Sequence, residues 1–281
     1  MSTLLALAAA VVFGTIDYIG GHQSKKYKVI AVSGGAHIVG LSVGILLVLF
    51  TGSWISPTWG FDGYLLPGIL AGVVGFIGLN AFFAGLSTGK MGVVSAISSL
   101  STIIPVSIAL LTGEKPSSLV AIGMAIAIIG GFTASGPEIR GGVGVKPILY
   151  GVAAALFFGI GVYFITLGSK TSALLTMTAM RIPTVSFVII LALITKSVGG
   201  IDGAIIKSLV VVGSGDFIAN ILLGVASTRG LVSVAVVLAG LYPVVTAIWA
   251  YFHSHERLHT IQYFGIIATI TGASIISFAS A

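Results

Sequence analysis

The sequence predicts an all-α integral membrane protein with ten transmembrane helices arranged as a 5+5 inverted repeat. Three observations support this fold class: an apolar composition, ten apolar runs of helical length and an internal repeat. Hydrophobic residues make up 57% of the 281 residues, and charged residues make up only 7%. An ordinary soluble domain contains about 25% charged residues. The composition therefore excludes a soluble globular protein.

Clusters of Gly, Pro, Ser and charged residues separate the apolar runs. A helix needs about 20 residues to cross a hydrocarbon core of about 30 Å. The ten predicted spans are residues 3–20, 29–51, 64–86, 93–112, 117–134, 147–167, 172–195, 205–224, 231–251 and 261–280. These runs are apolar on every face, whereas the strands of a membrane barrel alternate in polarity over segments of about ten residues.

The two halves of the sequence repeat in register. A Phe-Gly pair in the first span recurs in the sixth, and each half ends with a proline, an acidic turn and a glycine-rich span. These landmarks are Phe13, Gly14, Pro105 and Glu114 in the first half and Phe158, Gly159, Pro243 and Glu256 in the second. Five spans per unit force the second unit to enter the membrane from the opposite face, and inverted repeats suit alternating access to a central site. We expect a first repeat at 1–135, a linker at 136–146 and a second repeat at 147–281.

Two long stretches carry a resemblance to a known family. They read VVSAISSLSTIIPVSIALLTGEKPSSLVAIGMAIAIIGG and VVLAGLYPVVTAIWAYFHSHERLHTIQYFGIIATITGASI. Together with the Phe-Gly pairs, they resemble the EamA family of the drug/metabolite transporter superfamily. The resemblance implies ten helices in two EamA repeats and a secondary transporter of amino acids, drugs or similar solutes. Many members have an arginine in the second helix of each repeat; Arg181 fits this place in the seventh span, but residues 34–37 of the second span read Gly-Gly-Ala-His.

Apart from Lys207 at the start of the eighth span, three formally charged residues lie inside the predicted spans, namely Asp17, Arg181 and Asp216. A charge in the middle of a membrane costs about 2.5 to 3.5 kcal/mol or more, so each is a candidate for substrate binding or coupling. Asp216 and Asn220 are one helical turn apart and can share a face. We expect Arg181 to face a central cavity and to bind an anionic group of the substrate, alternating with a carboxylate of the protein. The alternative is a permanent ion pair between Arg181 and Asp216.

Asp17 lies late in the first span, on a face shared with Phe13, Gly14 and Tyr18. A lone carboxylate in a cavity of low dielectric can carry a proton. The interpretation is proton or substrate coupling, and the alternative is solvation at a helix end. Further cavity-lining candidates are Tyr18, Asn80, Ser98, Ser99, Tyr163, Tyr242 and Trp249. The serines belong to a hydroxyl stripe that also includes Ser95 and Thr102, and such hydroxyls often only bond to helix carbonyls.

Several functions are disfavoured by missing patterns. The chain has no cysteine and neither a Walker sequence nor a dinucleotide fingerprint, so we expect no cofactor. The histidine-rich loop 253–259 fits a polar turn better than a metal site. The net charge of +6 comes from scattered residues, which favours lipid headgroups over nucleic acid.

The predicted function is a multi-pass secondary transporter of the cell membrane, not an enzyme. Its expected partners are a small-molecule substrate, the lipid bilayer and, as one option, a coupling proton. The alternatives are an intramembrane enzyme, a channel and a sensor, and these lack a recognisable acid, base and nucleophile set or a selectivity sequence.

Overall fold

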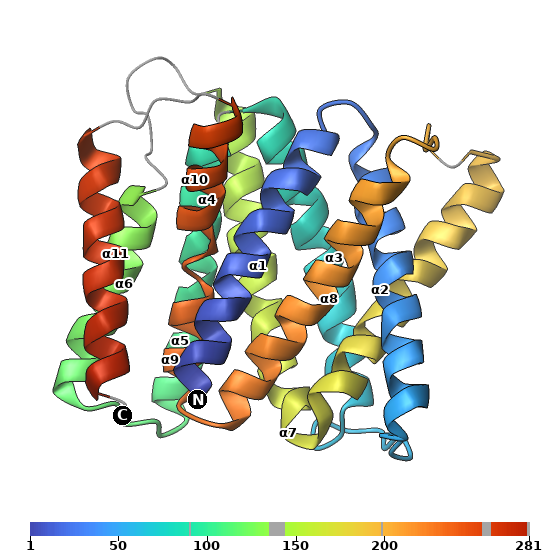
Figure 1. Cartoon of the computed structure of the whole chain (residues 1–281). Coiled ribbons are helices and arrows are strands. Elements are labelled where there is room, and N and C mark those ends of the chain that lie inside the picture. Colours follow the sequence, from blue (N-terminus) through green and yellow to red (C-terminus); the bar gives the residue numbers. More distant parts are fainter. Residues whose placement is uncertain (90, 135–143, 198, 255–259, 280–281) are drawn as a thin grey trace.

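The protein folds into a bundle of long helices, and no strand occurs among the residues described (Figure 1). The computed structural model describes residues 1–89, 91–134, 144–197, 199–254 and 260–279. The helices are α1 (Ser2–Gln23), α2 (Val29–Thr51), α3 (Leu65–Thr88), α4 (Met91–Ser99), the 3₁₀ helix η1 (Leu100–Thr102), α5 (Ile103–Leu111), α6 (Ser118–Ala134), α7 (Val145–Thr195), α8 (Ile206–Thr228), α9 (Val232–Ala239), α10 (Tyr242–Ser254) and α11 (Thr260–Ala279).

Eight helical segments in the described part of the chain are long and apolar enough to cross a membrane, and α6 is a shorter apolar helix of 17 residues. Large apolar side chains such as Leu49, Phe50 and Leu193 lie on the outside, as expected for contact with lipid. The prediction of an all-helical membrane protein is confirmed. The predicted count of ten separate spans is not established by these helices, because α7 runs over 51 residues.

The long helix α7 is two helices joined at a kink. A straight α-helix of 51 residues would extend about 77 Å, more than twice the hydrocarbon core. At Ser172 the backbone is extended, with φ −164° and ψ 115°, and the chain changes direction there. The helix begins at Val145, two residues before the predicted span, because Pro147 lies in the first turn, where the missing N–H has no partner to lose.

Two helices break in the interior of the bundle. The first consists of α4, η1 and α5, and the second of α9 and α10, with Gly240 and Leu241 between them. A proline follows each break, and because proline has no N–H, it leaves the carbonyl four residues earlier without its helical donor. The two breaks touch, since a side chain on Gly240 would overlap the Thr102 side chain. The sequence predicted continuous spans here and treated the prolines only as repeat landmarks.

Small residues let the helices approach closely. Gly14 of α1 packs against the Tyr242 carbonyl of α10, and the Thr246 hydroxyl donates a hydrogen bond to the Gly14 carbonyl at 3.1 Å. At the edge of the bundle α6 and α11 lie side by side (Figure 1), with Gly130 against Thr269. These contacts place α1 beside the second helix break.

The acidic turn of the first repeat has a defined role. The Glu114 carboxylate accepts hydrogen bonds from the backbone N–H groups of Val232, at 2.7 Å, and Ser233, at 3.0 Å. It therefore caps the start of α9 and joins the two halves of the chain. The matching Glu256, residues 136–143 of the predicted linker and residues 255–259 of the histidine-rich loop lie outside the described residues.

Candidate functional site

A cavity lies among α1, α2, α3, α7, α8 and the two broken helices. It encloses about 810 Å³ of space not filled by atoms, part of which is open to solvent. Its polar lining residues are Asp17, His37, Ser101, Thr102, Arg181, Asp216, Asn220 and Tyr242. Much of the remaining wall is apolar and includes Phe13, Leu79, Phe158, Ile165 and Met180. A mostly apolar cavity with a few converging polar groups has the general character of a small-molecule site.

At one end of the cavity Arg181 is paired with Asp216. The guanidinium Nη2 donates to Oδ2 of Asp216, and the Asn220 amide donates to Oδ1 at 3.2 Å. The Arg181 side chain is completely buried, whereas 17% of the Asp216 side chain is exposed. Arg181 Nε is buried and has no hydrogen-bond partner among the described atoms. The pair therefore joins the second part of α7 to α8, and the cavity reaches it from the side of Asp216.

His37 completes the environment of Arg181. Its Nε2 lies 2.8 Å from Arg181 Nη1, and its Nδ1 lies 3.0 Å from the Thr184 hydroxyl. Arginine can only donate, so Nε2 must be the acceptor. The Thr184 hydroxyl donates its single proton to the Arg181 carbonyl at 2.9 Å and must therefore accept from Nδ1–H. These contacts fix His37 as a neutral ring with the proton on Nδ1.

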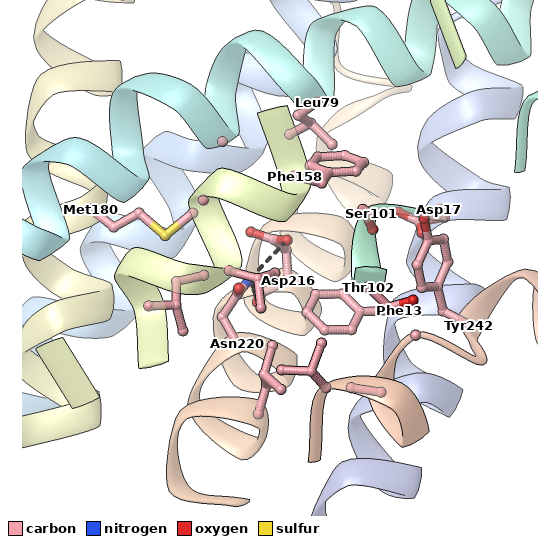
Figure 2. A pocket seen from close by; sticks show the side chains of 18 of the residues that line it. Phe13, Asp17, Leu79, Ser101, Thr102, Phe158, Met180, Asp216, Asn220 and Tyr242 are labelled. Atoms are coloured by element: carbon pink, nitrogen blue, oxygen red, sulfur yellow. Dashed lines mark hydrogen bonds between the residues drawn. The ribbon is translucent and has the colours of Figure 1, made fainter. Parts of the chain in front are cut away.

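At the other end of the cavity lies Asp17, as Figure 2 shows with Ser101 and Tyr242 close to it. The residue is 8% exposed, and among the described residues no ion pair or hydrogen bond reaches its carboxylate. Tyr242 does not provide one, because its hydroxyl is hydrogen-bonded to the Ser98 hydroxyl at 2.9 Å. Asp17 thus faces the cavity as an unpaired acid.

Comparison with known proteins bears on this arrangement. The model of the EamA-like transporter family matches residues 1–135 and 145–278. The chain belongs to this EamA family. A crystal structure described only as that of a protein superposes on it with a TM-score of 0.77 at 17% identity, over 98% of each chain. That likeness concerns the fold alone. No curated protein matches the sequence.

Membership of the EamA family makes the chain a multi-pass membrane protein of the transporter type. Of the residues that the sequence singled out, the structure brings five to the cavity of this EamA protein. They are Asp17, Arg181, Asp216, Asn220 and Tyr242. The landmarks Phe13 and Phe158 also line it, although they were predicted only as marks of the repeat.

Six candidates do not line this cavity, because their polar groups serve other contacts or lie elsewhere. Ser99 donates to the Ala96 carbonyl, and Asn80 accepts from Ser33 at 2.9 Å and donates to the Phe76 carbonyl. Trp249 donates to the Thr15 hydroxyl at 2.9 Å. The other three are Ser98, which binds Tyr242, Tyr18, which stacks on His22, and Tyr163, whose ring lies beside Phe164.

Three polar lining residues were not on the list of candidates, namely His37, Ser101 and Thr102. His37 lies in the Gly-Gly-Ala-His stretch that stands where the family has its first arginine, and this position was the available signal. Ser101 and Thr102 lie four and three residues before Pro105, so the helix break was their signal, and Thr102 also belonged to the hydroxyl stripe. Within the described residues, no group of three His, Asp or Glu side chains could hold a metal ion.

Proposed function

We propose that this EamA protein is a secondary transporter that moves a small solute by alternating access to the central cavity. The observation that supports this most is the convergence of buried charge. Asp17, Arg181 and Asp216 come from three different helices, and all three line one cavity. Ionisable residues inside a membrane are expensive and mark substrate or ion pathways.

We further propose ten spans in a 5+5 inverted repeat, with repeats at 1–135 and 147–281. Counting α7 as two spans divided at Ser172, and each broken helix as one, gives ten. The start of α1 and the end of α11 lie at the same face of the bundle (Figure 1), as an even number of crossings requires. The breaks before Pro105 and Pro243 then occupy matching places in the two repeats. Their movement against each other is our proposed route for alternating access.

The contacts of Arg181 favour the ion-pair alternative over direct substrate binding. Two guanidinium nitrogens are engaged by Asp216 and His37, and the third is buried away from solvent. A solute in the cavity therefore meets Asp216 and Asn220 before it meets the arginine. We propose that the pair holds α7 and α8 together around the cavity. Binding of an anionic group by Arg181 stays a prediction for another state, in which the pair has opened.

Asp17 is the proposed coupling residue. Its carboxylate is buried, unpaired among the described residues and open to the cavity, so one proton can bind there and leave again. A carboxylate that must release its proton before it binds a solute couples the two movements. The alternative of solvation at a helix end fits less well, because Asp17 lies six residues before the end of α1.

The test is counterflow in proteoliposomes. Vesicles loaded with an unlabelled metabolite mixture are diluted into a trace of the same mixture carrying ¹³C, and entry is followed by mass spectrometry. A carrier gives transient uphill entry of at least one labelled solute, and only when the vesicles are preloaded. Labelled-solute entry that does not depend on preloading indicates a channel, and absence of entry for every solute overturns the proposal.

Coupling is tested in the same vesicles with an imposed pH gradient. Asp17→Asn should abolish the effect of the gradient on exchange, while Asp202→Asn, in an exposed loop, should leave it intact. An unchanged dependence in Asp17→Asn would show that the proton uses another route.

A further inference from the structure

The charge of the cavity is not balanced. Its charged lining residues are Asp17, Asp216 and Arg181, and His37 is neutral by its hydrogen bonds. Arg181 is paired with Asp216, so one negative charge remains, on Asp17, once that carboxyl has released its proton. An anionic solute would be repelled at that end, whereas a cation would find the counter-charge that the protein itself does not supply.

A second polar group near Asp17 also lines the cavity (Figure 2). The Ser101 side chain is 6% exposed, lines the cavity and has no hydrogen-bond partner for its hydroxyl among the described residues. Buried polar side chains in native proteins nearly always have a partner. Asp17 and Ser101 are therefore two polar groups in one cavity that a ligand can contact without displacing a protein partner.

The acceptors at this end of the cavity are the Asp17 carboxylate and the Ser101 hydroxyl. The Ser101 carbonyl is not among them, because it accepts a backbone N–H at the end of η1. A carboxylate accepts hydrogen bonds and carries a negative charge, so the ligand group that fits it best is a positively charged donor.

The surroundings of these acceptors are aromatic and apolar. Phe13 and Tyr242 line the same end, with ring centroids 6.4 Å apart, and Phe158 follows deeper in the cavity. Aromatic faces attract cations, and Leu79 and Met180 line the cavity farther from Asp17 (Figure 2). A bare metal ion would leave this apolar wall without a partner, whereas an organic cation would cover it.

We propose that the cavity binds an amphipathic primary amine, with its ammonium group at the Asp17 carboxylate and the Ser101 hydroxyl and its apolar body along the aromatic wall. An ammonium group carries one positive charge and three donors, which matches the acceptors present. The inference rests on the proposed function in taking the cavity as the transport site, and it adds the charge class of the substrate.

The experiment measures binding to the purified full-length protein in detergent by isothermal titration calorimetry. Three probes share one ring: 2-phenylethylamine, the neutral 2-phenylethanol and the anion 3-phenylpropanoate; sodium chloride is a fourth. We expect the amine to bind about tenfold or more tighter than the alcohol and the anion not to bind. Equal binding of amine and alcohol, tighter binding of the anion, or binding of sodium without binding of the amine would each overturn the proposal.

Variants locate the site. Asp17→Asn should bring the amine down to the affinity of the alcohol, and Asp202→Asn should bind like the unaltered protein. If Asp17→Asn does not fold, Ser101→Ala carries the test, since it removes the hydroxyl beside the carboxylate. Ser101→Ala should weaken amine binding several-fold; unchanged amine affinity in this variant would refute the site.

Binding in detergent does not require transport, so the two proposals fail separately. Selective amine binding without counterflow of any solute would sustain the amine site and overturn the transporter. Counterflow of other solutes without amine binding would sustain the transporter and overturn the amine site.

Discussion

The buried pair of Arg181 and Asp216 allows a quantitative prediction. Removing one member leaves the other without its partner, which costs about 3 to 5 kcal/mol for a buried pair. The two losses should differ, because Arg181 is completely buried and Asp216 is 17% exposed to the cavity. Asp216→Asn should therefore lie near the upper value and Arg181→Gln near the lower one. The double variant should recover about 1 to 3 kcal/mol relative to the sum of the two.

The assay is equilibrium unfolding in mixed micelles of a mild detergent and sodium dodecyl sulfate, followed by circular dichroism. All three variants are also reconstituted for counterflow. If the pair is a structural bridge, the double variant regains both stability and most of the transport lost in either single variant. Losses that simply add would refute the bridge. A double variant that folds well yet stays inactive would instead assign Arg181 to the substrate.

Three further predictions follow from single contacts. His37→Leu should destabilise the protein by about 1 to 3 kcal/mol, because the buried Nη1 donor of Arg181 then has no acceptor in place of His37. His37→Gln can both accept and donate, so it should recover most of this loss in the same unfolding assay. Gly14→Ala should cost about 1 to 3 kcal/mol by overpacking, while Gly161→Ala, whose added methyl meets its nearest neighbour at 3.5 Å, should be neutral; equal stabilities would contradict the packing. The Tyr27 hydroxyl donates a hydrogen bond to Asp202 at 3.0 Å and holds the pKa of this loop carboxyl below its usual 3.8. The stabilisation from this hydrogen bond is therefore present above about pH 4 and is lost as the pH falls further. Tyr27→Phe should make the stability of the protein depend less on pH in this acid range.

Much of the fold follows from composition and repeat, and less follows for the site. Helical spans are legible because every backbone group in lipid must be bonded within its own helix, which forces long apolar runs. Asp17, Arg181 and Asp216 could also be found from the sequence, because a charge inside a membrane raises the free energy of the protein and is therefore seldom present without a function. Which neutral polar residue faces a cavity depends on the rotation of its helix, and helices that are apolar on every face do not encode that rotation.

The misplaced candidates show this limit. Asn80 and Trp249 are polar residues in apolar spans, yet each is hydrogen-bonded to a neighbouring helix. Asn80 bonds to Ser33, and Trp249 bonds to Thr15. His37 was passed over because it was compared with an arginine that it does not replace; instead it binds one from the other half of the chain. Such pairings are long-range contacts, and a single sequence does not specify them.

The most direct test of alternating access uses a protein that contains no cysteine. Ala239→Cys places one thiol in the cavity wall, and Ile129→Cys places one on the exposed face of α6 as a control. Each variant is reconstituted in sealed vesicles and treated with a membrane-impermeant thiol reagent from outside only or from inside only. Alternating access predicts that the thiol at position 239 reacts from either side, with a rate that counterflow conditions change, and that the thiol at position 129 reacts from neither. A thiol at position 239 that reacts from one side only, under every solute condition, would contradict alternating access.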